Sequence, residues 1–435
     1  MNPLATEGPA LNTPAPASAA PAMRRMVAAA VAGNALEFYD FGSYAFFAVY
    51  ISKAFFPTST PLAGLLLTLA VFGVGFVSRP LGGVVIGAYA DRHGRKPAML
   101  LTIVLITVGT LGLALTPSYD SIGLAGPLIV VACRLVQGLA LGGEVGPSTA
   151  FLVEIAPPGQ RGLYSSWQLA SQGLAILIAG LVGLLLTSTL APAQLQVWGW
   201  RVPFVLGLVA IPLGIYLRRN LPETMLHGHG VRPAMALSQL RAHGRLIALA
   251  VLVVIGGTVS TYVGSYMTTY AIATLKLPAA VAMGATVTVG IVTLVFALVG
   301  GALSDRYGRK PVMLIPRVLS AVLAVPAFLF LIEAKSPGAL IGVTFVLALL
   351  TAVSSGAAMV ALPELLPSSV RSTGLSIAYA VGVAIFGGST QFMVTWLIGV
   401  TGNAAMPAWW VTITSVVAAV GIMALPEGRD HTLPA

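Results

Sequence analysis

Twelve long apolar segments constrain this chain more than any other feature of its sequence. In lipid, a helix satisfies its own backbone hydrogen bonds, whereas an isolated strand does not. A helix of about 20 apolar residues crosses the ~30 Å hydrocarbon layer of a bilayer. The sequence therefore predicts an all-α integral membrane protein with twelve transmembrane helices. The segments cover residues 27–55, 62–90, 97–115, 122–152, 163–188, 199–217, 246–275, 281–303, 311–332, 338–362, 373–398 and 406–425.

The composition agrees with a membrane location. Only 8% of the residues are charged and 57% are hydrophobic, whereas about 25% of an ordinary soluble domain is charged. A soluble enzyme and a nucleic-acid-binding fold are therefore unexpected. The single cysteine, Cys133, and the scattered histidines offer no metal cluster, and no phosphate-binding Gly-x-x-x-x-Gly-Lys-Ser/Thr run is present. We expect no cofactor, no metal and no enzymatic activity.

A hydrophilic break at residues 218–245 separates six spans from six spans. We predict one six-helix bundle over residues 23–217, a cytoplasmic linker over 218–245 and a second six-helix bundle over 246–425. The Ala- and Pro-rich residues 1–22 are expected to form a disordered cytoplasmic leader, and residues 426–435 a cytoplasmic tail.

The basic residues gather on one side of the predicted membrane. Such an excess is typical of cytoplasmic loops, so we expect both termini in the cytoplasm and a bacterial-type inner-membrane location. The net charge of +10 then reflects topology and does not indicate a nucleic-acid partner. Of the 23 Lys and Arg residues, 16 lie on the side of the termini, because Lys53, Arg201, Lys276 and Lys335 lie on the other side and Arg79, Arg134 and Arg317 lie within spans.

Two loops are nearly identical, which indicates an internal repeat. Residues 87–97 read GAYADRHGRKP, and residues 301–311 read GALSDRYGRKP. An acid followed seven residues later by an arginine also recurs, after the fourth span and after the tenth. Parallel repeats of six spans, with a site at their interface, are a transporter architecture.

These loops supply candidates for a gate that holds the cytoplasmic side shut. Their charges can pair with the ends of neighbouring helices and separate when that side opens. The alternative is that the basic residues serve topology alone, but topology does not need the recurring acids. The gating candidates are Asp91, Arg92, Arg95, Glu154, Arg161, Asp305, Arg306, Arg309, Glu364 and Arg371.

The repeated Gly-x-x-x-Asp-Arg-x-Gly-Arg-Lys loop resembles the signature loop of the major facilitator superfamily. Residues 363–371 (PELLPSSVR) are most similar to the citrate–proton symporter branch of its metabolite:proton symporter family. The resemblance implies a major facilitator fold of two six-helix pseudo-repeats and proton-coupled uptake by alternating access. Further segments similar to that family are residues 33–41 (GNALEFYDF), 78–83 (SRPLGG), 134–144 (RLVQGLALGGE) and 198–204 (WGWRVPF).

Charged residues within the predicted spans are candidates for the transport chemistry, because an ionised side chain at the bilayer centre costs at least ~2.5 kcal/mol. Arginine stays charged and matches carboxylates with a bidentate fork, so Arg79 and Arg134 are candidate substrate contacts. Arg317 lies seven residues after Lys310, and we expect it to snorkel to the cytoplasmic interface, with a substrate role as the less favoured alternative.

Glu37 and Asp40 lie one turn apart, on the face of the first span that also carries Gly33 and Tyr44. Two carboxylates so close repel each other, which favours protonation of one of them. Proton coupling requires such a group, and static pairing with the two arginines is the alternative. Glu144 is a third proton-coupling candidate, with a role in the gate as its alternative.

Neutral polar residues complete the candidate site. The second half is expected to supply neutral contacts and movement, because Arg317 is the one charged residue within its spans. Helix–helix hydrogen bonding is the alternative role for the amides. The neutral candidates are Tyr44, Gln137, Gln168, Gln172, Tyr262, Tyr266 and Tyr379.

These features together predict a proton-coupled symporter for a small carboxylate, with citrate or a related tri- or dicarboxylate first. An α-ketoglutarate or betaine/proline carrier is the alternative. A drug–proton exporter is less favoured, because residues 173–180 lack the Gly-Pro-x-x-Gly-Gly-like run of such carriers. The expected partners are the substrate anion, protons and the bilayer, and the expected functional unit is a monomer.

Overall fold

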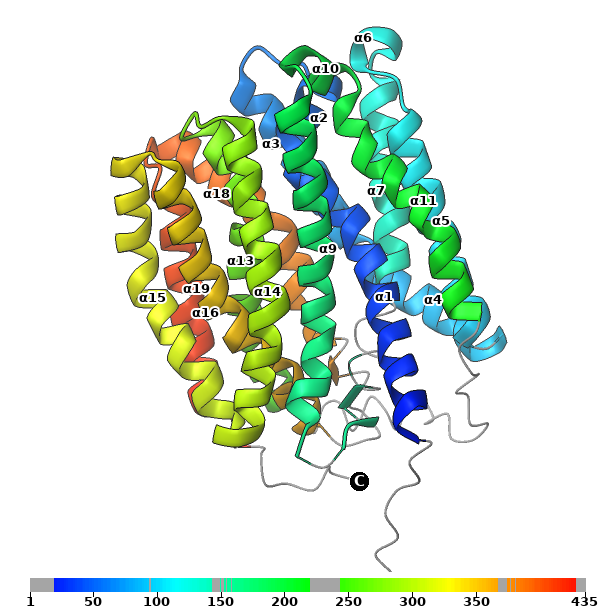
Figure 1. Ribbon diagram of the computed structural model, residues 1–435, viewed down its shortest axis with the longest axis vertical. Helices are drawn as coiled ribbons and strands as arrows, with labels where there is room; N and C mark the ends of the chain where they lie inside the picture. Colours follow the sequence, from blue (N-terminus) through cyan, green and yellow to red (C-terminus); the bar gives the residue numbers. More distant parts are fainter. Residues whose placement is uncertain are drawn as a thin grey trace, which may run out of the picture.

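The computed structural model describes residues 19–93, 95–142, 149, 152–153, 155–157, 159–219, 243–366, 374–375, 377–379 and 381–427, and the regular structure in these ranges is helical. Long helices run side by side, with the short helices α2, α6 and α10 near one end (Figure 1). Those of the first half are α1 (Ala19–Phe46), α2 (Ala48–Phe55), α3 (Pro61–Val77), α4 (Arg79–His93), α5 (Arg95–Leu115), α6 (Tyr119–Ile122), α7 (Ala125–Leu141), α9 (Arg161–Thr189), α10 (Pro192–Val197), the 3-10 helix η1 (Gly199–Arg201) and α11 (Val202–Arg219).

The second half repeats this plan of long helices joined by short connections. Its eleventh span contains a π-helical stretch, η2, followed directly by α18. The helices are α13 (Gly244–Ala273), α14 (Ala279–Tyr307), α15 (Arg309–Ala334), α16 (Pro337–Glu364), η2 (Gly382–Gly387), α18 (Gly388–Thr401) and α19 (Met406–Ala424).

The predicted fold class is confirmed. Within the described ranges, eight helical segments are long and apolar enough to cross a membrane, and three shorter apolar helices lie at Leu100–Leu115, Ala125–Leu141 and Gly199–Pro212. Together with α1, these segments correspond one to one with the twelve predicted spans. The exact domain boundaries stay a prediction, since most of the 218–245 linker lies outside the described residues.

Two helices begin at the capping signals that the sequence carries. The side chain of Thr60 accepts a hydrogen bond from the backbone N–H of Ala63 before α3, at 3.3 Å, and Pro61 occupies the first turn. Ser336 accepts from Ala339 in the same way before α16, at 3.2 Å. A Ser or Thr cap followed by proline is a favoured helix start, because it satisfies an otherwise unpaired donor.

The second predicted span is interrupted at Ser78, between α3 and α4. Pro80 causes this break because it lacks the N–H of the helical ladder and its ring crowds the preceding turn. The Ser78 hydroxyl donates to the carbonyl oxygen of Leu135 in α7 at 3.0 Å, which fixes the break against that helix. Arg79 thereby becomes the first residue of α4.

Helices α9 and α14 join the two halves through a tight glycine-lined contact, and they lie next to each other near the middle of Figure 1. A Cβ atom at Gly173 would collide with the backbone of Leu294, and one at Gly290 with the backbone of Leu177. Small residues permit such close backbone approach between helices in lipid. A second contact between the halves joins α3 to η2 and α18.

Candidate functional site

Two arginine side chains lie inside the bundle against aromatic rings. The guanidinium carbon of Arg79 is 4.1 Å from the ring centre of Phe76 and 4.6 Å from that of Phe41. The guanidinium carbon of Arg134 is 3.9 Å from the ring centre of Tyr44 and 5.8 Å from that of Phe41. Such cation–π contacts contribute about 0.5–2 kcal/mol each. They hold the planar groups in place without consuming their in-plane N–H donors.

Several donors of these arginines have no hydrogen-bond partner within the described part of the chain. Arg134 is fully buried, and its Nε, Nη1 and Nη2 atoms all lack a partner; the same holds for Nε and Nη2 of Arg79. Burying a charged group without hydrogen bonds is strongly unfavourable. The pair is therefore suited to an anionic ligand, because a carboxylate accepts two N–H bonds from one guanidinium.

Asp40 lies beside Arg134, and the two side chains attract each other electrostatically. The Oδ2 atom of Asp40 accepts a hydrogen bond from Nε2 of Gln137 at 2.5 Å, and this nitrogen also contacts the hydroxyl of Thr110 at 3.1 Å. The Oδ1 atom of Asp40 is buried with no hydrogen-bond partner among the described residues. One carboxylate oxygen is thus fixed, while the other is available to a proton.

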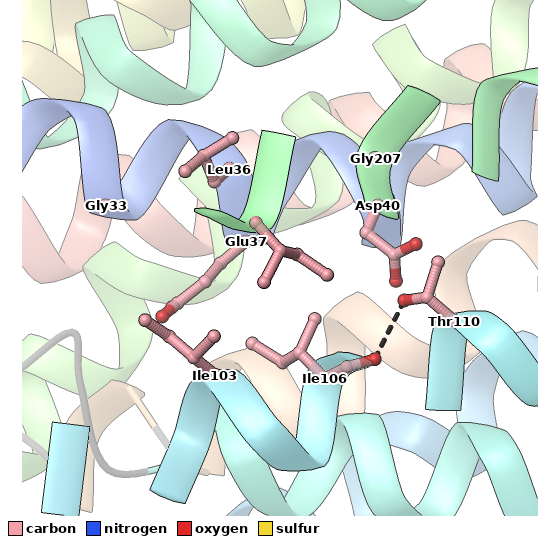
Figure 2. A pocket seen from close by; sticks show the side chains of 9 residues that line it. Gly33, Leu36, Glu37, Asp40, Ile103, Ile106, Thr110 and Gly207 are labelled. Atoms are coloured by element: carbon pink, nitrogen blue, oxygen red, sulfur yellow. Dashed lines mark hydrogen bonds between the residues drawn. The ribbon is translucent and has the colours of Figure 1, made fainter. Parts of the chain in front are cut away.

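Glu37 and Asp40 project toward α5, into a pocket between α1, α5 and α11 (Figure 2). Tyr44 instead lies under Arg134. The predicted face of α1 therefore meets two environments: the acids line the pocket, and Tyr44 packs on Arg134. Glu37 still interacts electrostatically with Arg79. The pocket has a cavity volume of about 30 Å³ and is completed by Gly33, Leu36, Ile103, Ile106, Thr110, Gly207 and Ile211.

Tyr262 of α13 brings the second half against the arginines. Its ring centre lies 5.3 Å from that of Phe76, and its hydroxyl interacts electrostatically with Arg79. The π-helix η2 packs here too, because Gly387 lies against both Tyr262 and Phe76. Such π-helical turns are frequent at functional sites. Tyr262 and η2 therefore couple the second half to the arginine pair.

Gln168 connects α9 to α1 through a reciprocal amide pair. Its Nε2 atom donates to Oδ1 of Asn34 at 3.0 Å, while Nδ2 of Asn34 donates to the backbone oxygen of Gln168 at 3.1 Å and to the hydroxyl of Ser171 at 2.6 Å. This geometry favours the helix-contact alternative for Gln168. Gln172, on the same helix, is half-buried.

The two remaining tyrosine candidates bond within the second half. The hydroxyl of Tyr266 accepts a hydrogen bond from Thr395 at 2.8 Å. The hydroxyl of Tyr379 donates to the sulfur of Met359 at 3.0 Å. Neither contact involves the arginine pair, so a substrate role for these two residues stays a prediction.

The sequence suggested that Arg317 snorkels to the interface. Instead, its side chain is buried inside the second half and is 2% exposed. Its Nη1 atom donates to the backbone oxygen of Gly256 at 2.8 Å and to the hydroxyl of Ser260 at 3.0 Å, and its Nη2 atom donates to Ser354 at 3.3 Å. The prediction was wrong because α13 and α16 supply enough acceptors to hold the guanidinium inside the second half.

An ionic network joins the two halves where the start of α9 lies against the end of α14. Asp305 accepts hydrogen bonds from the backbone N–H groups of Gly162 and Leu163, at 2.8 and 3.0 Å, at the start of α9. Arg309 bonds Asp305 at 2.7 Å and forms a bidentate pair with Glu364, with both distances 3.0 Å. A carboxylate at a helix N-terminus is stabilised by the helix dipole. The network thus links four helices, α9 of the first half with α14, α15 and α16 of the second.

The other gating candidates differ in position. Arg161 reaches Glu364 at 3.9 Å, whereas Arg306 is exposed and lies 5.3 Å from the ring centre of Tyr307. The backbones of Asp91, Arg92 and Arg95 lie in α4 and α5, while Glu144, Glu154 and Arg371 lie outside the described residues.

Four residues of these sites were not among the sequence-based candidates. Phe41 and Phe76 support the arginines, Thr110 contacts Gln137, and Glu427 accepts hydrogen bonds from the backbone N–H groups at the start of α15, including that of Arg309 at 2.7 Å. The recurrence of Leu-Pro-Glu at residues 221–223 and 425–427 was the available signal for Glu427. Phe41 adjoins Asp40, but nothing in the sequence distinguishes Phe76 from other apolar residues.

Comparison with known proteins gives consistent matches along the chain. The family described as Sugar (and other) transporter matches residues 26–241 and again residues 231–434. A citrate-proton symporter of Klebsiella pneumoniae is 38% identical over 388 residues, which cover 88% of this chain and 87% of the relative. The α-ketoglutarate permease of Escherichia coli K12 is 34% identical over 410 residues, with 94% and 95% covered.

More distant similarities agree with these. A proline/betaine transporter of Escherichia coli K12 is 31% identical over 427 residues, covering 94% of this chain and 85% of the relative. The crystal structure of a D-xylose-proton symporter superposes with a TM-score of 0.75 at 20% identity, covering 94% of this chain and 100% of that structure. At this identity the structural match concerns the fold alone.

Proposed function

Because this chain belongs to the sugar (and other) transporter family, we propose that it is a proton-coupled symporter for a small carboxylate, with citrate as the first candidate. It moves the substrate by alternating access, in which the two halves rock about a site at their interface. Relatives above 30% identity include carriers named for citrate, α-ketoglutarate and proline/betaine, so the choice of substrate rests on the site.

The observation that carries this proposal is a pair of arginines whose buried donors lack hydrogen-bond partners among the described residues. Arg79 and Arg134 share the ring of Phe41, at 4.6 and 5.8 Å from their guanidinium carbons. Two guanidiniums on one ring repel each other, and negative charge between or beside them offsets that repulsion. A substrate with two or more carboxylates supplies that charge and accepts two N–H bonds from each arginine.

The aromatic rings favour an anion over betaine. Quaternary ammonium groups are recognised by the faces of aromatic rings. Here Arg79 already lies over Phe76 and Arg134 over Tyr44. Because these faces hold guanidinium groups, an additional cation there would be repelled. The site thus fits citrate or α-ketoglutarate better than a betaine.

Asp40 is proposed as the coupling carboxylate, with Glu37 close to it on the same helix. When Asp40 is ionised it attracts Arg134. A proton on Oδ1 removes that attraction and leaves Arg134 to bind the substrate. Proton and substrate then load together, which is the requirement for symport.

The network of Asp305, Arg309, Glu364 and Arg161 is proposed as the gate on the side of the chain termini. By the distribution of basic residues this side is the cytoplasm of a bacterial inner membrane. Opening breaks the bonds between Asp305 and the start of α9, and the halves then separate at that end. A monomer contains the complete proposed site.

Uptake of [14C]citrate by proteoliposomes with an imposed pH gradient, acidic outside, tests the proposal. We expect accumulation that stops when the gradient is collapsed by an ionophore. Unlabelled α-ketoglutarate, betaine and proline serve as competitors. Citrate uptake that is independent of the pH gradient would contradict proton coupling. Competition by betaine but not by carboxylates would overturn the substrate assignment.

A further inference from the structure

The pocket between α1, α5 and α11 lies within the first half, whereas a carrier of this architecture moves its substrate between the halves. Asp40 has contacts in both directions: its Oδ2 atom bonds to Gln137 of α7, and its side chain lines the pocket (Figure 2). Its Oδ1 atom is buried and has no hydrogen-bond partner among the described residues. This oxygen is therefore free to accept a proton, and the pocket that Asp40 lines lies on the side of α1 that faces α5.

A cavity at the corresponding place in the second half is lined by uncharged residues, one of which, Ser260, accepts a hydrogen bond from Arg317. It has a cavity volume of about 20 Å³ and is lined by α13, α15, α16 and α19, with Ser260, Ser320, Thr344 and Thr351 as its polar residues. The first-half pocket instead carries two carboxylates. Since burying a carboxylate is costly, Glu37 and Asp40 serve a purpose that packing does not explain.

The pocket extends from the middle of the helices toward the end that carries the chain termini. Thr110, next to Asp40, lies fifteen positions after Arg95, roughly 22 Å along α5, whereas Ile103 lies eight positions after it, roughly 12 Å. Glu37 is one turn closer than Asp40 to the start of α1. The two acids and the pocket therefore form a line from the arginine site toward this end.

We infer that this pocket is a proton route that connects Asp40, through Glu37, with the side of the membrane that carries the chain termini, separate from the substrate path. The inference rests on the proposed function. In the conformation described here, the bonds of Asp305 to Gly162 and Leu163 close the substrate path at this end. The proton leaves Oδ1 of Asp40 for water in the pocket, passes to the Glu37 carboxylate and is released as hydronium, which regenerates both carboxylates.

The charged and titratable groups near Asp40 fit this role. Arg134 and Cys133 face it from α7, and Tyr39 and Glu37 accompany it on α1. The lining that α5 and α11 contribute is neutral: three isoleucines, Thr110 and Gly207. Arg134 attracts the ionised form of Asp40, while Glu37 is the one further acid that lines the pocket.

A cysteine placed in the pocket tests the route. Ile106→Cys is made in a Cys133→Ser background, which removes the native thiol, and is treated with methyl or benzyl methanethiosulfonate added to the aqueous phase. Val411→Cys, in the second-half cavity, is the matched control. We expect the benzyl adduct at position 106 to lower citrate uptake driven by a pH gradient at least tenfold while citrate counterflow changes less than twofold. Glu37→Gln should likewise lower the driven uptake at least tenfold while citrate counterflow changes less than twofold.

The opposite results overturn the inference. These are equal loss of driven uptake and counterflow, no loss of either, or failure of the aqueous reagents to modify the Ile106→Cys variant. If the unmodified protein shows no citrate counterflow, the result contradicts the proposed function and not the proton route. In that case, proton uptake after a pH jump, followed with a soluble pH indicator, still tests the route: the benzyl adduct at position 106 should slow it at least tenfold, and an unchanged rate overturns the route.

Discussion

Nε2 of Gln137 lies 2.5 Å from Oδ2 of Asp40 and 3.1 Å from the hydroxyl of Thr110, so a single amide joins α7, α1 and α5. The protonation state of Asp40 therefore affects three helices of the first half at once. Its attraction to Arg134 extends that effect to the arginine pair. The first half thus contains both the proposed proton carrier and the proposed substrate ligands.

Asp40→Asn should separate coupling from exchange. The amide keeps the shape of the carboxylate but neither ionises nor attracts Arg134 electrostatically. We expect uptake driven by a pH gradient to fall at least tenfold, with counterflow of [14C]citrate retained and independent of pH between 5.5 and 8. The matched control is Asp120→Asn, an acid in the short helix α6 at the far end of the bundle. Counterflow lost together with driven uptake would assign Asp40 to substrate binding instead.

Arg134→Lys should weaken citrate binding while preserving the charge. Lysine cannot offer a bidentate fork, and a lost hydrogen bond to a charged group costs about 1.5–3 kcal/mol. This corresponds to a roughly 10- to 100-fold higher dissociation constant, to be measured by calorimetry in detergent. Arg245→Lys, at an exposed position of α13, is the control. Equal affinities for both variants would remove Arg134 from the site.

Glu364→Gln should weaken the ionic network. Asp305 then remains as the one carboxylate bonded to the Arg309 guanidinium among the described residues. Removing one partner of a buried ion pair costs about 3–5 kcal/mol. We expect a lower melting temperature and a shift of the population toward the state open at the terminus side, detected as faster labelling of a cysteine that replaces the half-buried Leu163, whose backbone bond to Asp305 the substitution keeps. Glu333→Gln, an exposed acid near the other end of α15, should change neither quantity.

Gly290→Ala should disturb the contact between the halves. The added methyl group meets the backbone of Leu177, which has no free rotation with which to move aside. Overpacking of this kind costs about 1–3 kcal/mol, visible as a lower melting temperature and slower transport. In Gly338→Ala nothing lies within 4 Å of the new Cβ, so this control should be as stable as the parent. If Gly290→Ala left both the melting temperature and the transport rate unchanged, α9 and α14 would be shown to tolerate separation.

The sequence predicted the helices well because membrane spans follow from local properties. Length and apolar content act within each segment, and lipid imposes the same requirement on each span. The break before Pro80, within the span predicted over residues 62–90, was not foreseen. The internal repeat at Asp91 and Asp305 indicated the two-half architecture for a related reason: similar segments fold into similar units.

Arg317 shows where local reasoning failed. Its distance from Lys310 along the chain permits snorkelling, yet Gly256, Ser260 and Ser354 hold it inside the second half. These acceptors lie on α13 and α16, far away in sequence. Whether a buried arginine is accommodated depends on the neighbouring helices, which the spacing within its own helix does not specify.

By itself, the sequence determined that twelve helices cross a membrane in two related halves and that acids and arginines lie within the first of them. The tertiary structure decided what those charges face. Helical periodicity places Glu37, Asp40 and Tyr44 around one helix, but the packing of α5, α7 and α11 against α1 directs the acids to a pocket within the first half and Tyr44 to Arg134. A helix fixes the angles between its own side chains, and only its neighbours determine the surroundings to which each angle leads.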